Sequence, residues 1–271
     1  MAGRNVGIDE LEAAMAEGWW PLEHRWLGCW LLRASAGFTG RGNSALPLGD
    51  PGCALPTALD RVETFYRDRG LPPRFSVPGP VVGEVDRGRL AEALGARGYA
   101  AATPTAVMTA DAAEVARVAG VADAPTCGLR LLDEPDDAWL ALYRYRGQRL
   151  PPEAGRLLRS APYQRFAAVV DDGRTVAVGR LAIARGWAGI TAMQVAETHR
   201  RRRLGWAVLA ALAGHAVDRG APHLYLQVAV ENTPARRLYA SAGFRDHHGY
   251  HYRVLGPEAA RERHVTRPTE K

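Results

Sequence analysis

The chain of 271 residues has three cysteines and no long apolar run. Cys29, Cys53 and Cys127 lie far apart and form no CxxC pair, so we expect neither a disulfide framework nor a metal site. No apolar stretch approaches the ~20 residues that cross a bilayer. The first ten residues have no apolar centre, which argues against a signal peptide. These absences predict a soluble cytoplasmic protein with no membrane partner.

Lysine is almost absent, because Lys271 is the only one and arginine supplies the rest of the positive charge. The formal net charge is +6, and the run Arg200 to Arg203 accounts for most of it. A nucleic-acid partner is not expected, because it would require a broad basic face. A short cluster such as Arg200 to Arg203 suits a small anionic group such as phosphate. The alternative is that these arginines lie at a solvated helix start and bind no ligand.

The pattern of apolar residues predicts alternating strands and helices, typical of an α/β or α+β fold with a mixed sheet. Asp9 and Glu12 resemble a capping box at the first helix. The expected helices are 9–18, 57–69, 89–97, 136–145, 151–159, 204–219 and 234–242. The expected strands are 26–35, 44–48, 74–77, 101–108, 129–132, 166–170, 176–184, 190–195, 223–228 and 245–254.

Two short segments recur in the same order and in the same predicted context. Residues 68–72 (DRGLP) match 218–222 (DRGAP), and 97–99 (RGY) correspond to 242–244 (AGF). Chance is the alternative, because glycine often follows a helix. The repeat predicts two pseudo-repeated domains. Their expected limits are 1–110 for a degenerate N-terminal domain, 111–127 for a partly helical linker, 128–256 for a catalytic domain and 257–271 for a flexible tail.

The strongest chemical signal is the predicted strand, loop and helix over residues 193–212. The first turn of a helix leaves backbone N–H groups without partners, and the helix dipole favours negative charge there. Arg200 to Arg203 add donors that grip phosphate oxygens. Physical chemistry alone therefore predicts a diphosphate ligand at this loop.

The same residues resemble a known family. Arg200 to Gly205 are similar to motif A of the GNAT N-acetyltransferases, Q/R-x-x-G-x-G/A, and 232–244 (NTPARRLYASAGF) resemble the family's N-x-x-A-x-x-L-Y-x-x-x-G-F pattern. The resemblance covers residues 128–254. It implies a tandem GNAT-like fold, acetyl-CoA as co-substrate and an amine-bearing acceptor, either a small molecule or a protein.

The resemblance also implies roles for particular residues. Tyr239 takes the position of a general acid, with core packing as the alternative. Glu197 takes that of a base, with an exposed loop acid as the alternative. The backbone of Met193 and Val195 corresponds to the splayed strand that pairs with the pantetheine arm. The residues expected to bind the cofactor are Met193, Val195, Arg200, Arg201, Arg202, Arg203, Leu204, Gly205, Trp206, Ala207, Asn232 and Ala235.

One position departs from the family pattern, because Arg203 stands where the motif has its first glycine. If the loop needs a positive φ there, a side chain costs ~1–2 kcal/mol. Either the loop is remodelled, or the arginine contributes a phosphate contact.

We therefore expect an acetyl-CoA-dependent N-acetyltransferase in which the amine attacks the thioester directly in a ternary complex. A non-catalytic acyl-CoA sensor is the alternative, and an RNA-binding module is a weaker one. The offset of 150 aligns Arg200 to Leu204 with Asp50 to Ala54, which contain one acid, Asp50, and no basic residue. We therefore expect one acetyl-CoA per chain, in the C-terminal half.

Overall fold

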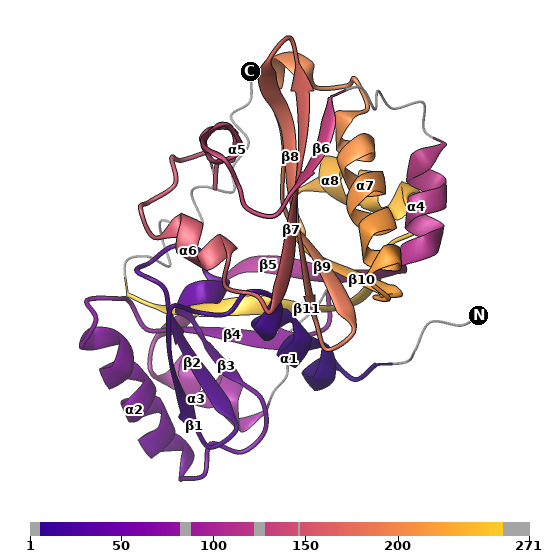
Figure 1. Ribbon diagram of the computed structural model, residues 1–271. Helices are drawn as coiled ribbons and strands as arrows, with labels where there is room; N and C mark the ends of the chain where they lie inside the picture. The colour runs from indigo at the N-terminus through magenta and orange to yellow at the C-terminus, as the bar shows by residue number, and fades with distance from the viewer. Residues whose placement is uncertain (1–5, 82–87, 122–127, 146, 257–271) are drawn as a thin grey trace. The chain divides into compact units, whose positions relative to one another are not determined.

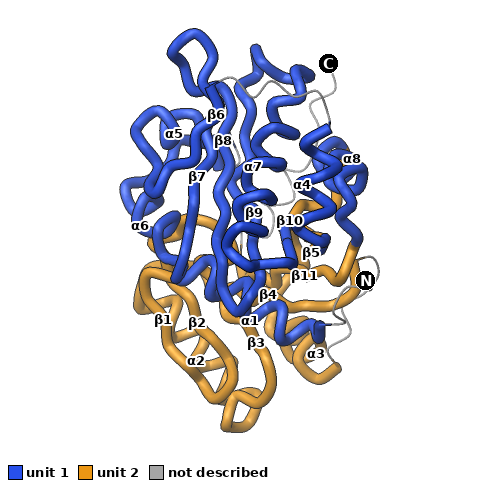
Figure 2. The backbone as a smooth tube through the Cα atoms, turned by 45° about the vertical axis from the view of Figure 1, so that its right-hand side comes forward, with its two compact units in different colours: residues 1–20, 108–227, 234–245 blue, residues 21–107, 228–233, 246–271 orange. Residues whose placement is uncertain are grey.

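The structure is a computed structural model that describes residues 6–81, 88–121, 128–145 and 147–256 (Figure 1). The expected tail at 257–271 and Cys127 lie outside the described residues. The chain divides into two compact units (Figure 2). Unit 1 comprises residues 1–20, 108–227 and 234–245, and unit 2 comprises 21–107, 228–233 and 246–271.

Unit 1 is built on a sheet in the order β6-β7-β8-β9-β10. Strands β6 to β9 are antiparallel neighbours, whereas β10 runs parallel to β9 after the crossover helix α7. The strands are β6 (Leu129–Leu132), β7 (Tyr163–Asp171), β8 (Arg174–Ala184), β9 (Trp187–Val195) and most of β10 (His223–Ala229). The helices are α1 (Ile8–Gly18), α4 (Ala112–Gly120), α5 (Asp137–Leu142), α6 (Ala154–Leu158), α7 (Leu204–Asp218) and most of α8 (Thr233–Ser241).

Helix α7 covers one face of this sheet. Its buried Val208 and Leu212 belong to the core, and α4 packs beside it (Figure 1). The turn between β7 and β8 has Asp172 at φ 46° and Gly173 at φ 73°. Two successive positive φ angles are those of a type I′ hairpin, as Asp-Gly predicts. Helix α7, which connects β9 to β10 in sequence, is thus held on the sheet by burial of its apolar face.

Unit 2 repeats this pattern. Its sheet order is β1-β2-β3-β4-β11-β5, and β4 runs parallel to β3 after the crossover helix α2. Aromatic side chains fill its core, with Phe75 edge-on to both Trp30 and Tyr99. The elements are β1 (Glu23–Leu27), β2 (Trp30–Ala34), a 3-10 turn (Arg41–Asn43), β3 (Ala45–Pro47), α2 (Leu55–Arg67), β4 (Arg74–Gly79), α3 (Arg89–Ala96), most of β5 (Tyr99–Asp111) and most of β11 (Arg245–Leu255).

The last strand of the chain completes the sheet of unit 2. Strand β11 pairs antiparallel with β4, from Gly249 opposite Gly79 to Val254 opposite Arg74. It therefore lies between β4 and β5. The compact units for this reason differ from the contiguous halves 1–110 and 128–256 that the repeat led us to expect.

The segment expected to be a linker contains a helix. Residues 112–120 form α4, and the side chain of Asp111 caps it by accepting a hydrogen bond from the amide of Glu114 at 2.9 Å. Ala112, Val115 and Ala119 form its buried stripe. A partly helical segment was expected here, and the small alanines at helical spacing explain why the periodic signal is weak. Residues 122–127 of the expected linker lie outside the described residues.

Three other expectations about elements need correction. Residues 26–35 are not one strand, because β1 and β2 form a hairpin with Gly28 at φ 54° in its turn. The first helix begins at Ile8 after Gly7, so Asp9 does not cap it. Helices α5 and α6 are shorter than 136–145 and 151–159, since the described residues between them, which include Pro151 and Pro152, are not helical.

Candidate active site

Strand β9 separates from β10 halfway along its length. The parallel pairing runs from His223 opposite Trp187 to Leu226 opposite Ile190. From Thr191 to Val195, β9 has no registered partner on the described part of β10. The backbone of Met193 and Val195 therefore lies in the segment where the expected splay is observed.

A β-bulge accompanies this separation. Val178 pairs with Gln194 and Arg180 with Thr191, so two residues of β9 lie opposite Gly179 alone. Ala192, inside the bulge, has φ 55°. A Cβ on Gly179 would lie 2.6 Å from Cγ1 of Val208 and 2.7 Å from Sδ of Met193. The bulge thus depends on a residue without a side chain at position 179.

A hollow of about 240 Å³ lies where the loop after β9 enters α7. The amides of Leu204 and Gly205 have no hydrogen-bond acceptor in the described part of the chain, whereas those of Trp206 and Ala207 bond to the carbonyl of Arg203. Free donors at the positive end of a fifteen-residue helix suit an anion. The lining residues are Val195, His199, Arg200, Arg201, Arg203, Leu204, Gly205, Trp206 and Leu238.

Arg203 has a positive φ at the position of the missing motif glycine. It stands before α7 in the left-handed conformation, with φ 58° and ψ 14°, and Arg201 also has a positive φ, 62°. The loop is therefore not remodelled to avoid this conformation. The side chain of Arg203 lines the hollow, where it adds positive charge.

Acidic neighbours engage part of the arginine run. Arg200 pairs with Glu197 at 3.3 Å, and Arg202 pairs with Asp171 on the β7–β8 turn at 3.1 Å. Arg202 is absent from the lining of the hollow, and Arg201 makes no ion pair with any described residue. The positive charge that faces the hollow comes chiefly from positions 200, 201 and 203.

Tyr239 lies on α8, directly after Leu238 of the hollow. Its ring packs edge-on against Phe244 with centroids 5.8 Å apart. Burial raises the pKa of Tyr239 to about 12, so the phenol stays protonated near neutral pH. Its hydroxyl has no hydrogen-bond partner among the described residues. Both packing and a protonated hydroxyl are therefore present at this position.

The other candidates are less closely tied to the hollow. Glu197 begins a 3-10 turn (Glu197–His199), and its side chain is 84% exposed. Met193, Ala207, Asn232 and Ala235 do not line the hollow. Asn232 belongs to unit 2, where its amide donates to the carbonyl of Ala229 at 2.9 Å.

Sequence reasoning missed two lining residues, His199 and Leu238. Leu238 is the leucine of the second motif, and a Cβ on Gly205 would lie 3.6 Å from its Cδ1 and 4.0 Å from Cγ2 of Val195. The motif thus contained a signal for Leu238. His199 contacts Asp171, with Nε2 3.4 Å from Oδ2, and no motif position indicated it.

The corresponding helix start in unit 2 is built differently. Helix α2 has a proline in its first turn, Pro56, which lacks an amide donor. Oδ1 of Asp50 accepts a hydrogen bond from the amide of Gly52 at 2.6 Å. A carboxylate and a missing donor make this start unsuited to a diphosphate.

The described residues contain neither a candidate metal cluster nor a helix that could span a membrane. No group of three or more histidine, cysteine, aspartate or glutamate side chains is arranged to hold a metal ion. None of the helices there is both long and apolar enough to cross a membrane.

Comparison with known proteins identifies the family of this chain. A family model described as "Probable histone acetyltransferase Rv0428c C-terminal" matches residues 6–253. The probable histone acetyltransferase Rv0428c of Mycobacterium tuberculosis is 31% identical over 92% of this chain and 74% of its own.

Two solved structures share the fold. A GCN5-related N-acetyltransferase from Kribbella flavida superposes with a TM-score of 0.65 at 18% identity, over 94% of this chain and 99% of that one. A tandem GNAT protein from the clavulanic acid biosynthesis pathway gives 0.62 at 15% identity, over 79% and 76%. The chain therefore belongs to the Rv0428c C-terminal family and, with it, to the GNAT N-acetyltransferase superfamily.

Proposed function

We propose that this N-acetyltransferase takes an acetyl group from acetyl-CoA and passes it to an amine by direct attack in a ternary complex. The observation that carries the proposal is the hollow before α7. Its free amides at Leu204 and Gly205 and its arginines 200, 201 and 203 match the charge of a pyrophosphate. The segment of β9 that is not paired with β10 ends at the same hollow, at Val195.

Each part of the chain has a distinct task in this proposal. The loop 200–207 holds the pyrophosphate, and the backbone of Met193 and Val195 binds the pantetheine arm and polarises the thioester carbonyl. Asn232 and Ala235 contact the cofactor chain, a role that rests on the motif alone. Acetyl-CoA supplies the activated acetyl group as a thioester.

Proton transfer is assigned to two side chains. As the amine nitrogen bonds to the carbonyl carbon and the carbon–sulfur bond breaks, Tyr239 donates its proton to the departing sulfur. Its pKa near 12 keeps that proton in place until the thiolate forms. Glu197 accepts the amine proton through water, since its carboxylate is exposed.

Charge at Gly205 provides the test of cofactor binding. A Cβ at Gly205 would make only ordinary van der Waals contacts. Because glutamine and glutamate have the same size, Gly205→Gln and Gly205→Glu differ chiefly in charge. We expect Gly205→Glu to abolish CoA binding in calorimetry, because a carboxylate at the helix start repels phosphate. Affinity equal to that of Gly205→Gln, in folded protein, would overturn the assignment.

The acyl-CoA sensor remains the second candidate, because the exposure of Glu197 leaves the base outside the hollow. Release of free CoA thiol during incubation with amines separates the two functions. The Mycobacterium tuberculosis relative is described as a probable histone acetyltransferase, so lysine-containing peptides belong in that screen beside small amines. RNA binding has less support, since acidic neighbours engage Arg200 and Arg202.

A further inference from the structure

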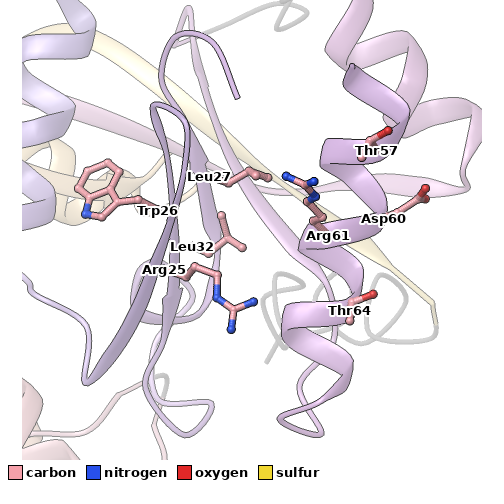
Figure 3. A pocket seen from close by; sticks show the side chains of 8 residues that line it. All are labelled: Arg25, Trp26, Leu27, Leu32, Thr57, Asp60, Arg61 and Thr64. Atoms are coloured by element: carbon pink, nitrogen blue, oxygen red, sulfur yellow. The ribbon is translucent and has the colours of Figure 1, made fainter. Parts of the chain in front are cut away.

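We propose that unit 2 contains a second binding site, for a small organic anion with an apolar body. The site is a hollow of about 460 Å³ between the β1–β2 hairpin and α2 (Figure 3). Its volume is that of an ordinary small-molecule site. The proposal is independent of acetyl-CoA binding, because every lining residue belongs to unit 2 and none to the loop before α7.

Two arginines face the hollow from opposite walls. Arg25 extends from β1 and Arg61 from α2, and Figure 3 shows both guanidinium groups in the space between them. Neither pairs with a carboxylate in the described part of the chain. Nη1 of Arg61 lies 4.0 Å from Sγ of Cys53. Two uncompensated cations at one hollow favour an anionic ligand.

The nearest acid does not neutralise these cations. Asp60 also lines the hollow, but its Oδ1 accepts from Nη1 of Arg97 at 2.7 Å. Glu63 contacts the same guanidinium at 3.1 Å. Both acids are thus engaged by Arg97 rather than by Arg25 or Arg61. Three arginines face two acids here, so the charge around the hollow is positive, and Arg25 and Arg61 can bind a ligand's carboxylate or phosphate.

Two leucines form part of the wall between the arginines, and Thr57 and Thr64 of α2 form another part. Leu27 and Leu32 line the hollow and are 9% and 1% exposed. The guanidinium of Arg25 lies 5.7 Å from the ring centroid of Phe65, a contact that restricts its position. Trp26 points to the other side of the hairpin (Figure 3). Charge at the rim and leucine beneath it match a ligand with an anionic head and a short apolar chain.

Octanoate and octyl phosphate are suitable probes, with octan-1-ol as the neutral control, in calorimetric titrations of the full chain. We expect at least one anion to bind, and we expect octan-1-ol to bind at least about tenfold more weakly than that anion. Arg25→Gln and Arg61→Gln should each weaken anion binding about tenfold, since each removes a charge-assisted hydrogen bond. Arg67→Gln is the matched control, because Arg67 is exposed on α2 and does not line the hollow.

Thermal unfolding of each variant checks that the fold is retained, and Gly205→Glu separates the two hollows. Anion binding that survives Gly205→Glu but falls in Arg61→Gln supports the second site. Three results overturn it: binding of neither anion, equal binding of octan-1-ol, or equal loss in Arg67→Gln. A carboxylate preference over phosphate, or the reverse, identifies the head group.

Discussion

The left-handed backbone at Arg203 allows stability and cofactor binding to be tested separately. Arg203→Ala and Arg203→Gly both remove the guanidinium that lines the hollow, so both should weaken CoA binding to the same extent. They differ in the backbone alone. At φ 58°, alanine destabilises the folded state by ~1–2 kcal/mol of backbone strain that glycine does not have.

The stability difference between the two variants is smaller than this strain, because glycine gives the unfolded chain more conformational freedom. That freedom stabilises the unfolded state by ~0.4–1 kcal/mol. We therefore expect Arg203→Gly to be more stable than Arg203→Ala by about 0.5–1 kcal/mol. For a chain of this size that is roughly 1–4 °C in Tm. Thermal and denaturant unfolding measure the difference, and calorimetry measures CoA affinity.

Arg202 provides a control with the opposite sign. It lies in the same exposed loop and is not among the described residues with positive φ. Arg202→Gly should therefore be less stable than Arg202→Ala by ~0.4–1 kcal/mol. If glycine were the less stable variant at both positions, strain at Arg203 would be refuted as the explanation.

Three other predictions follow from glycine packing, tyrosine burial and the two helix starts. Gly179→Ala should lower stability by ~1–3 kcal/mol, because its Cβ meets Val208 and Met193, whereas Gly214→Ala on α7 meets nothing within 4 Å and should raise Tm. Burial raises the pKa of Tyr239 to about 12, above its ordinary 10, so the contribution of the protonated phenol to stability is complete below pH 10 and is lost as pH rises through 12. The free energy of unfolding of Tyr239→Phe should therefore fall less steeply between pH 10 and 12 than that of the unaltered protein. The turnover of Tyr239→Phe should drop on the order of 10²-fold. Calorimetry should give one CoA per chain, and a stoichiometry of two would contradict the assignment of Asp50.

Local patterns predicted most elements, because burial of an apolar face leaves a period in the sequence. β6 at Leu129–Leu132 and the Asp172–Gly173 turn follow from such patterns. The sequence alone did not determine whether Arg203 has a positive φ, and the observed backbone shows that it does. The bulge at Ala192 was not predictable, since alanine carries no preference for positive φ.

Pairing partners distant in sequence were also beyond local patterns. Nothing in Arg245–Leu255 distinguishes a strand that pairs with β4 from one that joins its own half. In the candidate site, the motifs identified the loop, whereas the contact between His199 and Asp171 depends on how the β7–β8 turn approaches it.

The position of β11 has a consequence during synthesis of the chain. Unit 2 begins to emerge from the ribosome at residue 21, but the strand between β4 and β5 is made only from residue 245 onward. Until then, the inner edge of β4 presents unpaired backbone groups, which is the kind of edge that recruits foreign strands. The sheet of unit 2 therefore cannot be completed until Arg245–Leu255 has been synthesised, so residues 21–107 keep an incomplete sheet while the intervening chain is made.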